Sequence, residues 1–143
     1  MIRTRRLAAV AAAALAATLP AGGAAASTGT TRYRFFEQQV TFTPGSSSVE
    51  FTSLDYPGDH LHHGVDWTAT DHILCTFTAD GAPTCSGQLA MGSSMLLING
   101  HGGHGDFVVP ITGGTGRFAG ARGELHVMNV ADSENSDLVI TLS

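Results

Sequence analysis

The stretch "ITGGTGRFAGARG" at residues 111–123 is the feature that most restricts what this chain can fold into. Gly114, Gly116 and Ala119 fit the pattern G-x-G-x-x-A, which in dinucleotide-binding proteins cradles a pyrophosphate at the start of a long helix. The run "FVVPI" precedes the glycines as a strand should, but "RFAGARGELHVMNV" brings two more glycines and then strand-like alternation. Because no helix pattern follows the glycines, the stretch predicts a tight connection between antiparallel strands and not a nucleotide site.

The glycines of this connection also predict its backbone conformation. Gly113, Gly114 and Gly116 are expected to adopt the positive φ angles that other residues resist. Phe118 is expected to tuck under the turn as an apolar plug, and Arg122 to enter the strand that follows. In this interpretation the three glycines form a structural turn.

The rest of the chain alternates strand-like runs with turn sequences such as "TPGSSS", "PGD" and "ADGAP", and it shows no convincing helix. About eight antiparallel strands in a chain of this size fit a closed barrel or a sandwich. Closure removes exposed sheet edges, and eight strands leave room for side chains or one small ligand. The predicted strands are residues 32–42, 49–56, 63–78 (as one long or two short strands), 84–91, 94–99, 106–111, 123–130 and 137–143.

Cys75 and Cys85 flank the "ADGAP" turn at equal distances from Asp80. In a hairpin they face one another on the same side of the sheet, where a disulfide forms with little strain. Two free thiols or a metal-binding pair are the alternatives, and the pair lacks further ligands. The predicted disulfide closes a short loop and should stabilise the fold by about 2–3 kcal/mol.

The N-terminus has the features of a secretory signal peptide. Arg3, Arg5 and Arg6 are followed by the apolar run "LAAVAAAALAATLPAGGAAA", which ends in small residues of the A-x-A type before Ser27. We therefore expect residues 1–26 to be removed, residues 27–143 to form one domain, and the product to be secreted with no membrane attachment after cleavage. An uncleaved membrane anchor is the alternative.

The charge of the expected domain excludes two classes of partner. It has no lysine, and its twelve acidic residues outnumber its four basic ones, which are Arg32, Arg34, Arg117 and Arg122. Nucleic acids and anionic membrane surfaces are bound through basic patches, so neither is an expected partner.

Two motifs together carry a family resemblance. The run "ITGGTGRFAGARGEL" and the cysteine hairpin "TDHILCTFTADGAPTCSGQL" resemble the dirigent and allene oxide cyclase barrel superfamily, in particular its secreted bacterial members. The similarity spans roughly residues 50–143, and the strand at 32–42 is compatible with it. The stretch "DHLHHGVDWTA" departs from the family pattern, because it is shorter and richer in histidine.

This resemblance implies an all-β, eight-stranded antiparallel barrel with an apolar pocket. It implies binding of a small apolar or phenolic metabolite whose cyclisation or coupling the pocket steers, without a cofactor, by holding it in one conformation. Plant dirigent proteins associate into trimers, so the resemblance also suggests a homotrimer. A non-catalytic secreted carrier or binding module is the alternative function, and a histidine-based metal-binding protein is a weaker one.

Two polar residues match functional positions of the superfamily. Arg122 lies in "GARG", where dirigent proteins place an arginine that lines the pocket, and Glu37 lies in the first strand, where plant cyclases place a pocket carboxylate. If both point inward, Glu37 can accept a proton or orient a ligand oxygen. The alternative is a structural ion pair of Arg122 at the barrel end and a solvent-facing Glu37.

Four further residues are candidate ligand-binding groups. Tyr33 and Tyr56 can donate hydrogen bonds into a pocket, and Trp67 can line it. Asp59 follows Pro57 and Gly58 and is first of all a turn residue. The alternatives for the aromatic residues are places in a filled core or at the barrel rim.

The seven histidines are concentrated in "DHLHHGVD" and "NGHGGHGD". His60 and His62 project to one side of an extended segment, and the loop with His101 and His104 can approach them. Imidazole ligands suit Zn²⁺, Cu²⁺ or Ni²⁺, but no ligand spacing such as H-E-x-x-H occurs. We therefore predict no metal site and interpret the clusters as solvated loops.

Overall fold

The computed structural model describes residues 29–79, 83–103 and 105–143, so the expected signal peptide lies outside the described residues. The described chain is all-β apart from one turn of 3₁₀ helix, and none of its helices is long and apolar enough to cross a membrane. The elements are β1 (Thr31–Pro44), β2 (Ser48–Asp59), β3 (His62–His63), β4 (Ala69–Phe77), β5 (Pro83–Met91), β6 (Ser94–His101), β7 (Phe107–Gly114), η1 (Gly116–Phe118), β8 (Gly123–Asn129) and β9 (Ser136–Leu142).

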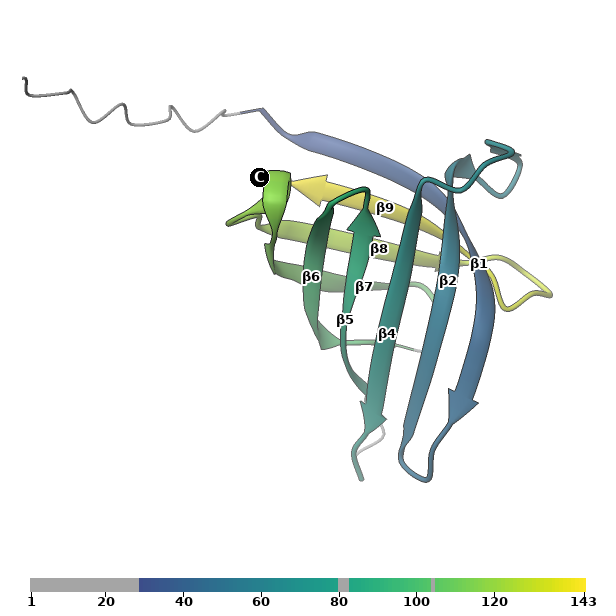
Figure 1. Ribbon diagram of the computed structural model, residues 1–143. Coiled ribbons are helices and arrows are strands. Elements are labelled where there is room, and N and C mark those ends of the chain that lie inside the picture. Colours follow the sequence, from purple (N-terminus) through teal and green to yellow (C-terminus); the bar gives the residue numbers. More distant parts are fainter. Residues whose placement is uncertain (1–28, 80–82, 104) are drawn as a thin grey trace, which may run out of the picture.

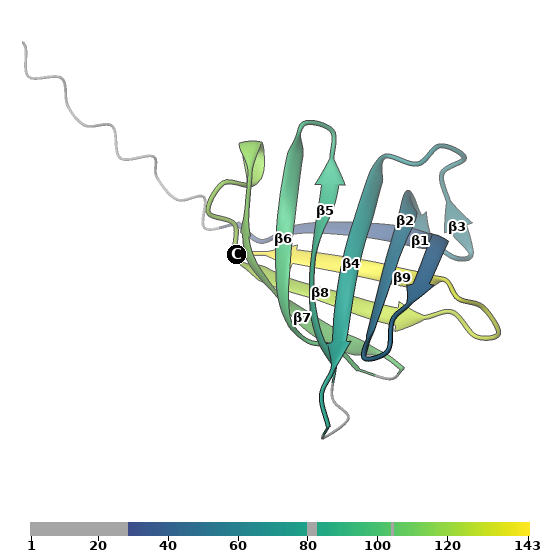
Figure 2. The ribbon, with the colours of Figure 1, turned by 60° about the horizontal axis from the view of Figure 1, so that its bottom comes forward.

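The sheet closes on itself. Its strands follow the order β1-β9-β8-β7-β6-β5-β4-β2, and β1 pairs with β2 to complete the ring. All neighbours are antiparallel, and β3 pairs only with the end of β2. The predicted eight-stranded antiparallel barrel is therefore confirmed. Strands β7, β8 and β9 cross behind β4, β5 and β6 at a steep angle, and the long β1 curves from one group to the other (Figures 1 and 2).

β1 joins the two halves of the barrel because its two ends have different partners. Residues 31–37 pair with β9, and residues 35–44 pair with β2. The register shifts between Gln39 and Thr41, and an irregularity of this kind bends a strand and increases its twist. Within β1, Phe35 and Glu37 are buried, Phe36 between them is half-buried, and Arg34 and Gln38 on either side are exposed. The alternation turns Glu37 to the inside of the barrel.

The core consists mainly of branched and aromatic side chains from every strand of the ring except β2, whose Val49 and Phe51 are only partly buried against it. Burial of this apolar surface, at roughly 25 cal/mol per Å², is the main term that holds the barrel together. The buried hydrophobic residues are Phe35, Ala69, Ile73, Cys75, Cys85, Leu89, Met91, Leu96, Ile98, Val109, Ile111, Phe118, Leu125, Leu138 and Ile140, and Val139 is buried beside them.

The glycine-rich connection is a turn, as predicted, but its glycines are needed for different reasons: one for its positive φ and another for lack of space. Gly116 has φ 57° and begins η1, and Phe118 at the end of η1 is buried, as expected of a plug. Gly113 and Gly114 end β7 without positive φ, which corrects the expected conformation. Gly114 is needed for space instead, because a Cβ there would lie 2.5 Å from the carbonyl oxygen of Phe118.

The segment predicted as residues 63–78 divides into two unequal strands. β3 has only two residues, and β4 begins at Ala69. The residues between them run through a loop in which Gly64 donates a backbone hydrogen bond to Pro57 and Thr68 donates one to Asp55. The alternative of two short strands, which the sequence left open, is thus the one closer to the structure.

Candidate functional site: a cavity with three buried carboxyl groups

The barrel encloses a cavity of about 270 Å³ with a mainly apolar wall. The cavity reaches the surface between the end of β4 and the loop that joins β8 to β9, where Phe77, Ser133 and Glu134 are exposed. A volume of this size suits a molecule of a few fused rings and is near the lower end of ordinary ligand sites. The apolar wall consists of Val49, Phe51, Ile73, Cys75, Cys85, Leu89, Ile98, Phe107, Val109, Leu125, Val127 and Leu138.

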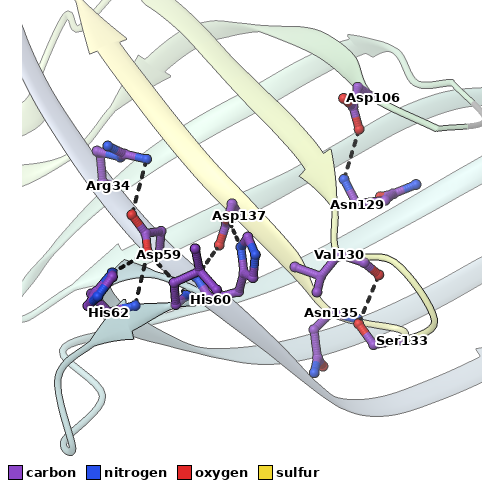
Figure 3. A network of polar contacts seen from close by, with 11 residues as sticks. Arg34, Asp59, His60, His62, Asp106, Asn129, Val130, Ser133, Asn135 and Asp137 are labelled. Atoms are coloured by element: carbon purple, nitrogen blue, oxygen red, sulfur yellow. Dashed lines mark hydrogen bonds and ion pairs between the residues drawn. The ribbon is translucent and has the colours of Figure 1, made fainter.

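Hydrogen bonds hold the loop at the cavity mouth in place. The backbone N–H of Gln39 donates to Asn135 Oδ1 at 3.2 Å, and Ser133 Oγ donates to the carbonyl of Val130 at 3.0 Å. Asp106 accepts a bond of 3.0 Å from the backbone N–H of Asn129 at the end of β8 (Figure 3). The rim is therefore fixed to β1 and to the segment before β7, and not only to its own strands.

Three carboxyl groups lie inside the barrel on neighbouring strands. Glu37 of β1 is opposite Asp55 of β2, and Ser53 of β2 is opposite Asp71 of β4. All four residues are buried, and Asp55 has no exposed surface. Glu37 and Asp71 line the cavity, whereas Asp55 does not. Acids are almost never fully buried without a partner, so this group calls for a functional explanation.

Few polar groups satisfy these acids. Ser53 Oγ donates a hydrogen bond of 2.8 Å to Glu37 Oε1. Both carboxyl oxygens of Asp55 and Oδ1 of Asp71 have no hydrogen-bond partner among the described residues. A buried carboxylate without partners is strongly destabilised relative to water, and such a group takes up a proton instead.

Burial and mutual repulsion shift all three pKa values upward. Burial raises the pKa of Glu37, and hydrogen bonds from Ser53, Ser136 and Asp71 oppose this shift. Burial and then the charge of Glu37 raise the pKa of Asp55 to about 7. Burial, followed by the charges of Glu37 and Asp55, raises the pKa of Asp71 to about 10. Near neutral pH the group therefore holds protons that ordinary carboxyl groups would have lost.

Of the predicted catalytic pair, only Glu37 lies at the cavity. Arg122 is exposed just before β8, and its guanidinium donates to the carbonyl of Ala121 at 2.7 Å. It lies outside the cavity wall and close to Gly113. The structure thus does not bring Glu37 and Arg122 together, and the cavity acids lack the basic partner that the sequence suggested.

The four candidate ligand-binding residues also lie outside this cavity. Tyr33 packs edge-on against Phe118, with ring centroids 6.0 Å apart, at the other end of the barrel. Tyr56 faces outward and donates to Gln38 at 3.3 Å. Trp67 is 54% exposed in the loop before β4. Tyr33 thus matches the core or rim alternative, whereas the exposed Trp67 belongs neither to this cavity nor to a filled core.

Asp59 organises the turn after β2, as its sequence position suggested (Figure 3). Its Oδ1 accepts bonds from the backbone N–H groups of Leu61 and His62 at 3.1 and 3.0 Å, and its Oδ2 lies 3.4 Å from Arg34. The bond from His62, together with the one from Leu61 and the charge of Arg34, lowers its pKa. The carboxylate of Asp59 thus stabilises the turn and does not line the cavity.

His60 fixes the same turn to the outer wall of the barrel. Its backbone N–H donates to Asp137 Oδ1 at 2.7 Å, and its Nδ1 lies 2.5 Å from Asp137 Oδ2 (Figure 3). His63 stacks on Phe36 at 4.6 Å between ring centroids. Among the described residues no three histidine, cysteine or acidic side chains are arranged to hold a metal ion, and His104 lies outside those residues.

The disulfide between Cys75 and Cys85 is present, as predicted. The two residues are directly opposite each other on β4 and β5, with Cα atoms 4.0 Å apart, and both line the cavity. The link therefore forms part of the cavity wall as well as closing the hairpin.

Sequence reasoning missed Asp55 and Asp71. Both could have been found from strand periodicity, because side chains at even spacings share one face of a strand. Asp71 lies four residues before Cys75, whose partner across the hairpin fixes its side of the sheet, and Asp55 lies four residues after Phe51. A polar residue in phase with a buried face marks a site that ordinary core packing does not explain.

The fold and the cavity define a class: closed eight-stranded antiparallel barrels with an internal pocket. A scan of the sequence against protein families matches none, and no curated protein shows significant sequence similarity. Solved structures are similar in fold. A pyocyanin demethylase has a TM-score of 0.60 and 22% identity, with 80% of this chain and 99% of that chain covered.

Two pterocarpan synthase dirigent proteins share the same barrel. One has a TM-score of 0.60 and 15% identity over 80% of this chain and 86% of its own. The other has a TM-score of 0.56 and 13% identity over 80% of this chain and 94% of its own. The resemblance to dirigent barrels that the sequence motifs indicated is therefore confirmed at the level of the fold.

Proposed function

We propose that this protein binds a small apolar or phenolic metabolite in its cavity and steers the cyclisation or coupling of that metabolite without a cofactor. The observation that carries the proposal is the group of buried carboxyls at an apolar cavity, with pKa values shifted toward or beyond neutrality. Acids with such shifts cluster at sites that transfer protons. The folds of a pyocyanin demethylase and of pterocarpan synthase dirigent proteins, both named for small molecules, support this class.

Each part of the cavity has a role in this proposal. The apolar wall binds the body of the ligand and excludes water, which strengthens electrostatic interactions inside. Glu37, with Ser53 hydrogen-bonded to it, is the group proposed to accept a proton from the ligand. Asp71 is protonated near neutral pH and is proposed to donate a hydrogen bond or a proton to a ligand oxygen. One acid and one base at the same cavity permit a tautomerisation or a ring closure.

Blocking the cavity tests the binding part of the proposal. Val109 is buried and lines the cavity, whereas its neighbour Val108 is 45% exposed on the outside of β7. We expect the fluorescent phenol 2-naphthol to bind the native protein and to bind Val109→Trp at least tenfold more weakly. Val108→Trp should bind it normally. Thermal melts identify any variant that fails to fold. If Val109→Trp does not fold, Val109→Phe replaces it, because its smaller side chain disturbs the core less and still narrows the cavity.

Absence of 2-naphthol binding to the native protein, or equal binding by both tryptophan variants, would refute the proposal. Binding without any proton-transfer activity would instead favour the non-catalytic carrier. That alternative keeps the cavity but assigns no chemistry to Glu37, so the exchange experiment described in the Discussion separates the two.

We further propose that the protein is secreted after cleavage following Ala26 and that it associates as a homotrimer. The disulfide supports secretion, because such links persist in oxidising compartments. Native mass spectrometry of protein from culture medium measures the mature N-terminus and the number of subunits together. A chain that still begins at residue 1 would contradict the proposed cleavage, and a monomer at all concentrations would contradict the proposed trimer.

A further inference from the structure

We propose that the cavity selects ligands that carry a positive charge, either a protonated amine or an N-alkylated aromatic nitrogen on an apolar frame. This inference rests on the proposed function, since it takes the same cavity as the binding site and specifies the class of its ligand. It follows from two observations: the cavity is lined by acidic side chains, and the basic side chains of the described residues lie outside it.

The cavity is lined by an almost completely buried acid that has one unpartnered carboxyl oxygen. Asp71 is 5% exposed, lines the cavity, and has one carboxyl oxygen without a hydrogen-bond partner among the described residues. Glu37 also lines the cavity, and Asp55, opposite Glu37 in the sheet, has both oxygens without a partner. A buried acid in this state lacks a donor or a cation, and a ligand in the cavity can supply either.

No basic side chain of the described residues compensates these acids. The charged groups that line the cavity are Glu37 from β1, Asp71 from β4 and Glu134 from the loop before β9, and β5 to β8 contribute none. The basic side chains lie elsewhere: Arg34 is near Asp59 outside the barrel, and Arg117 lies over the ring of Phe118. A ligand therefore meets acids at the interior end of the cavity and another acid at its mouth.

Electrostatics in such a cavity discriminate between ligand charges. A cation can replace the protons that the buried acids now retain, and its attraction to them is strong because the apolar wall excludes water. A neutral phenol gains only hydrogen bonds from the same groups. An anion is repelled and loses its hydration as well, so carboxylated ligands should be rejected.

The shape of the cavity favours an organic cation over a metal ion. The described residues contain no group of three side chains arranged for metal coordination. The wall instead provides broad apolar surfaces from Phe51, Phe107 and Leu125, which suit a flat or branched carbon frame. An aromatic ring near a cation adds a further attraction.

Bicyclic aromatic ligands of similar size and different charge test this inference. The test compares 1-methylquinolinium with its neutral carbon analogue 1-methylnaphthalene and with the anion 2-naphthoate, by calorimetric titration at pH 8. We expect 1-methylquinolinium to bind at least tenfold more tightly than 1-methylnaphthalene, and 2-naphthoate not to bind measurably. Titration in two buffers of different ionisation enthalpy should also show protons released as the cation binds.

Variants assign the preference to the acids. Asp71→Asn and Glu37→Gln should each reduce the preference for the cation at least fivefold and leave binding of 1-methylnaphthalene unchanged. Glu124→Gln is the control, because Glu124 is exposed on β8 and does not line the cavity. Equal binding of the cation and its neutral analogue, or a preference unaffected by both variants, would overturn the inference while leaving the proposed function intact. Failure of every ligand, 2-naphthol included, would instead refute the proposed function.

Discussion

Glu37 and Asp55 are directly opposite each other on β1 and β2, and both side chains point into the closed barrel. Like charges placed directly opposite in a sheet are destabilising, and burial increases the effect. The barrel tolerates the pair because protons neutralise part of the charge, as the raised pKa values of both groups indicate. The stability of the fold must therefore depend on pH.

The first prediction is that stability falls as pH rises through the neutral range. Asp55 has an ordinary pKa of 3.8 and a folded value of about 7, so the folded chain binds more protons than the unfolded chain between these values. Asp71, with a folded pKa of about 10, extends the same trend to alkaline pH. Each of the two groups lowers the free energy of unfolding by about 1.4 kcal/mol per pH unit while only the folded chain holds its proton, so we expect a total decrease on the order of 5–7 kcal/mol from pH 5 to pH 8. Urea unfolding at a series of pH values measures it, and a stability that rises over this interval would contradict the burial of these acids.

The second prediction is that neutralising a buried acid stabilises the protein at pH 8. Asp55→Asn has nearly the same shape and removes the charge that burial penalises, so unfolding should require about 1–3 kcal/mol more than in the native protein. At pH 4.5 the difference should shrink, because the native side chain is then protonated. The exposed Asp66 provides the control, and Asp66→Asn should change stability by less than about 0.5 kcal/mol at either pH.

The third prediction concerns proton transfer at Glu37. The aromatic ketone 2-tetralone has acidic protons next to its carbonyl group, and their exchange with D₂O can be followed by NMR. We expect the native protein to accelerate this exchange and Glu37→Gln to lower the acceleration by about 10²–10⁴-fold, the usual contribution of a general base. Ser53→Ala should have a smaller effect, because it removes only the hydrogen bond to Glu37. Exchange at equal rates in native protein and Glu37→Gln would assign no catalytic role to Glu37.

Much of the fold could be predicted because its determinants are local. Alternating runs and turn residues predicted the strands, and the spacing of Cys75 and Cys85 about a turn predicted their link. The glycine-rich connection was interpreted correctly as a turn, since the pattern after it excluded a helix. Local patterns failed at Gly113 and Gly114, because neither has positive φ, and at Gly114 the need is for space against η1 and β6.

The site was harder to predict from the sequence, because its residues come together only when the strands pair and the barrel closes. Glu37 becomes part of an acid group only when β1 pairs with β2 and β2 with β4, and no local pattern states that register. Arg122 matched a family motif, but its side chain turns to the carbonyl of Ala121 at the surface. A motif fixes the position of a residue along the chain, whereas packing around the barrel decides which face its side chain occupies.

The fourth prediction separates the two uses of glycine in the connection after β7. A Cβ at Gly114 would lie 2.5 Å from the carbonyl oxygen of Phe118 and 2.7 Å from that of Met95, and neither backbone can move freely. Gly114→Ala should therefore destabilise the fold by more than about 3 kcal/mol. Gly120 has φ 77° with open space around it, so Gly120→Ala should cost only about 1–2 kcal/mol of backbone strain. Equal effects of the two substitutions in urea unfolding would contradict the proposed distinction.

The fifth prediction is that the disulfide stabilises the barrel and shapes the cavity. Replacing both Cys75 and Cys85 by alanine frees the hairpin in the unfolded state, and we expect a loss of about 2–3 kcal/mol in the free energy of unfolding. Reduction of the native protein with dithiothreitol should produce a similar loss, and reduction should not affect the double variant. Because both cysteines line the cavity, the double variant should also bind 2-naphthol with altered affinity. A double variant as stable as the oxidised protein would show that β4 and β5 are held by pairing and packing alone.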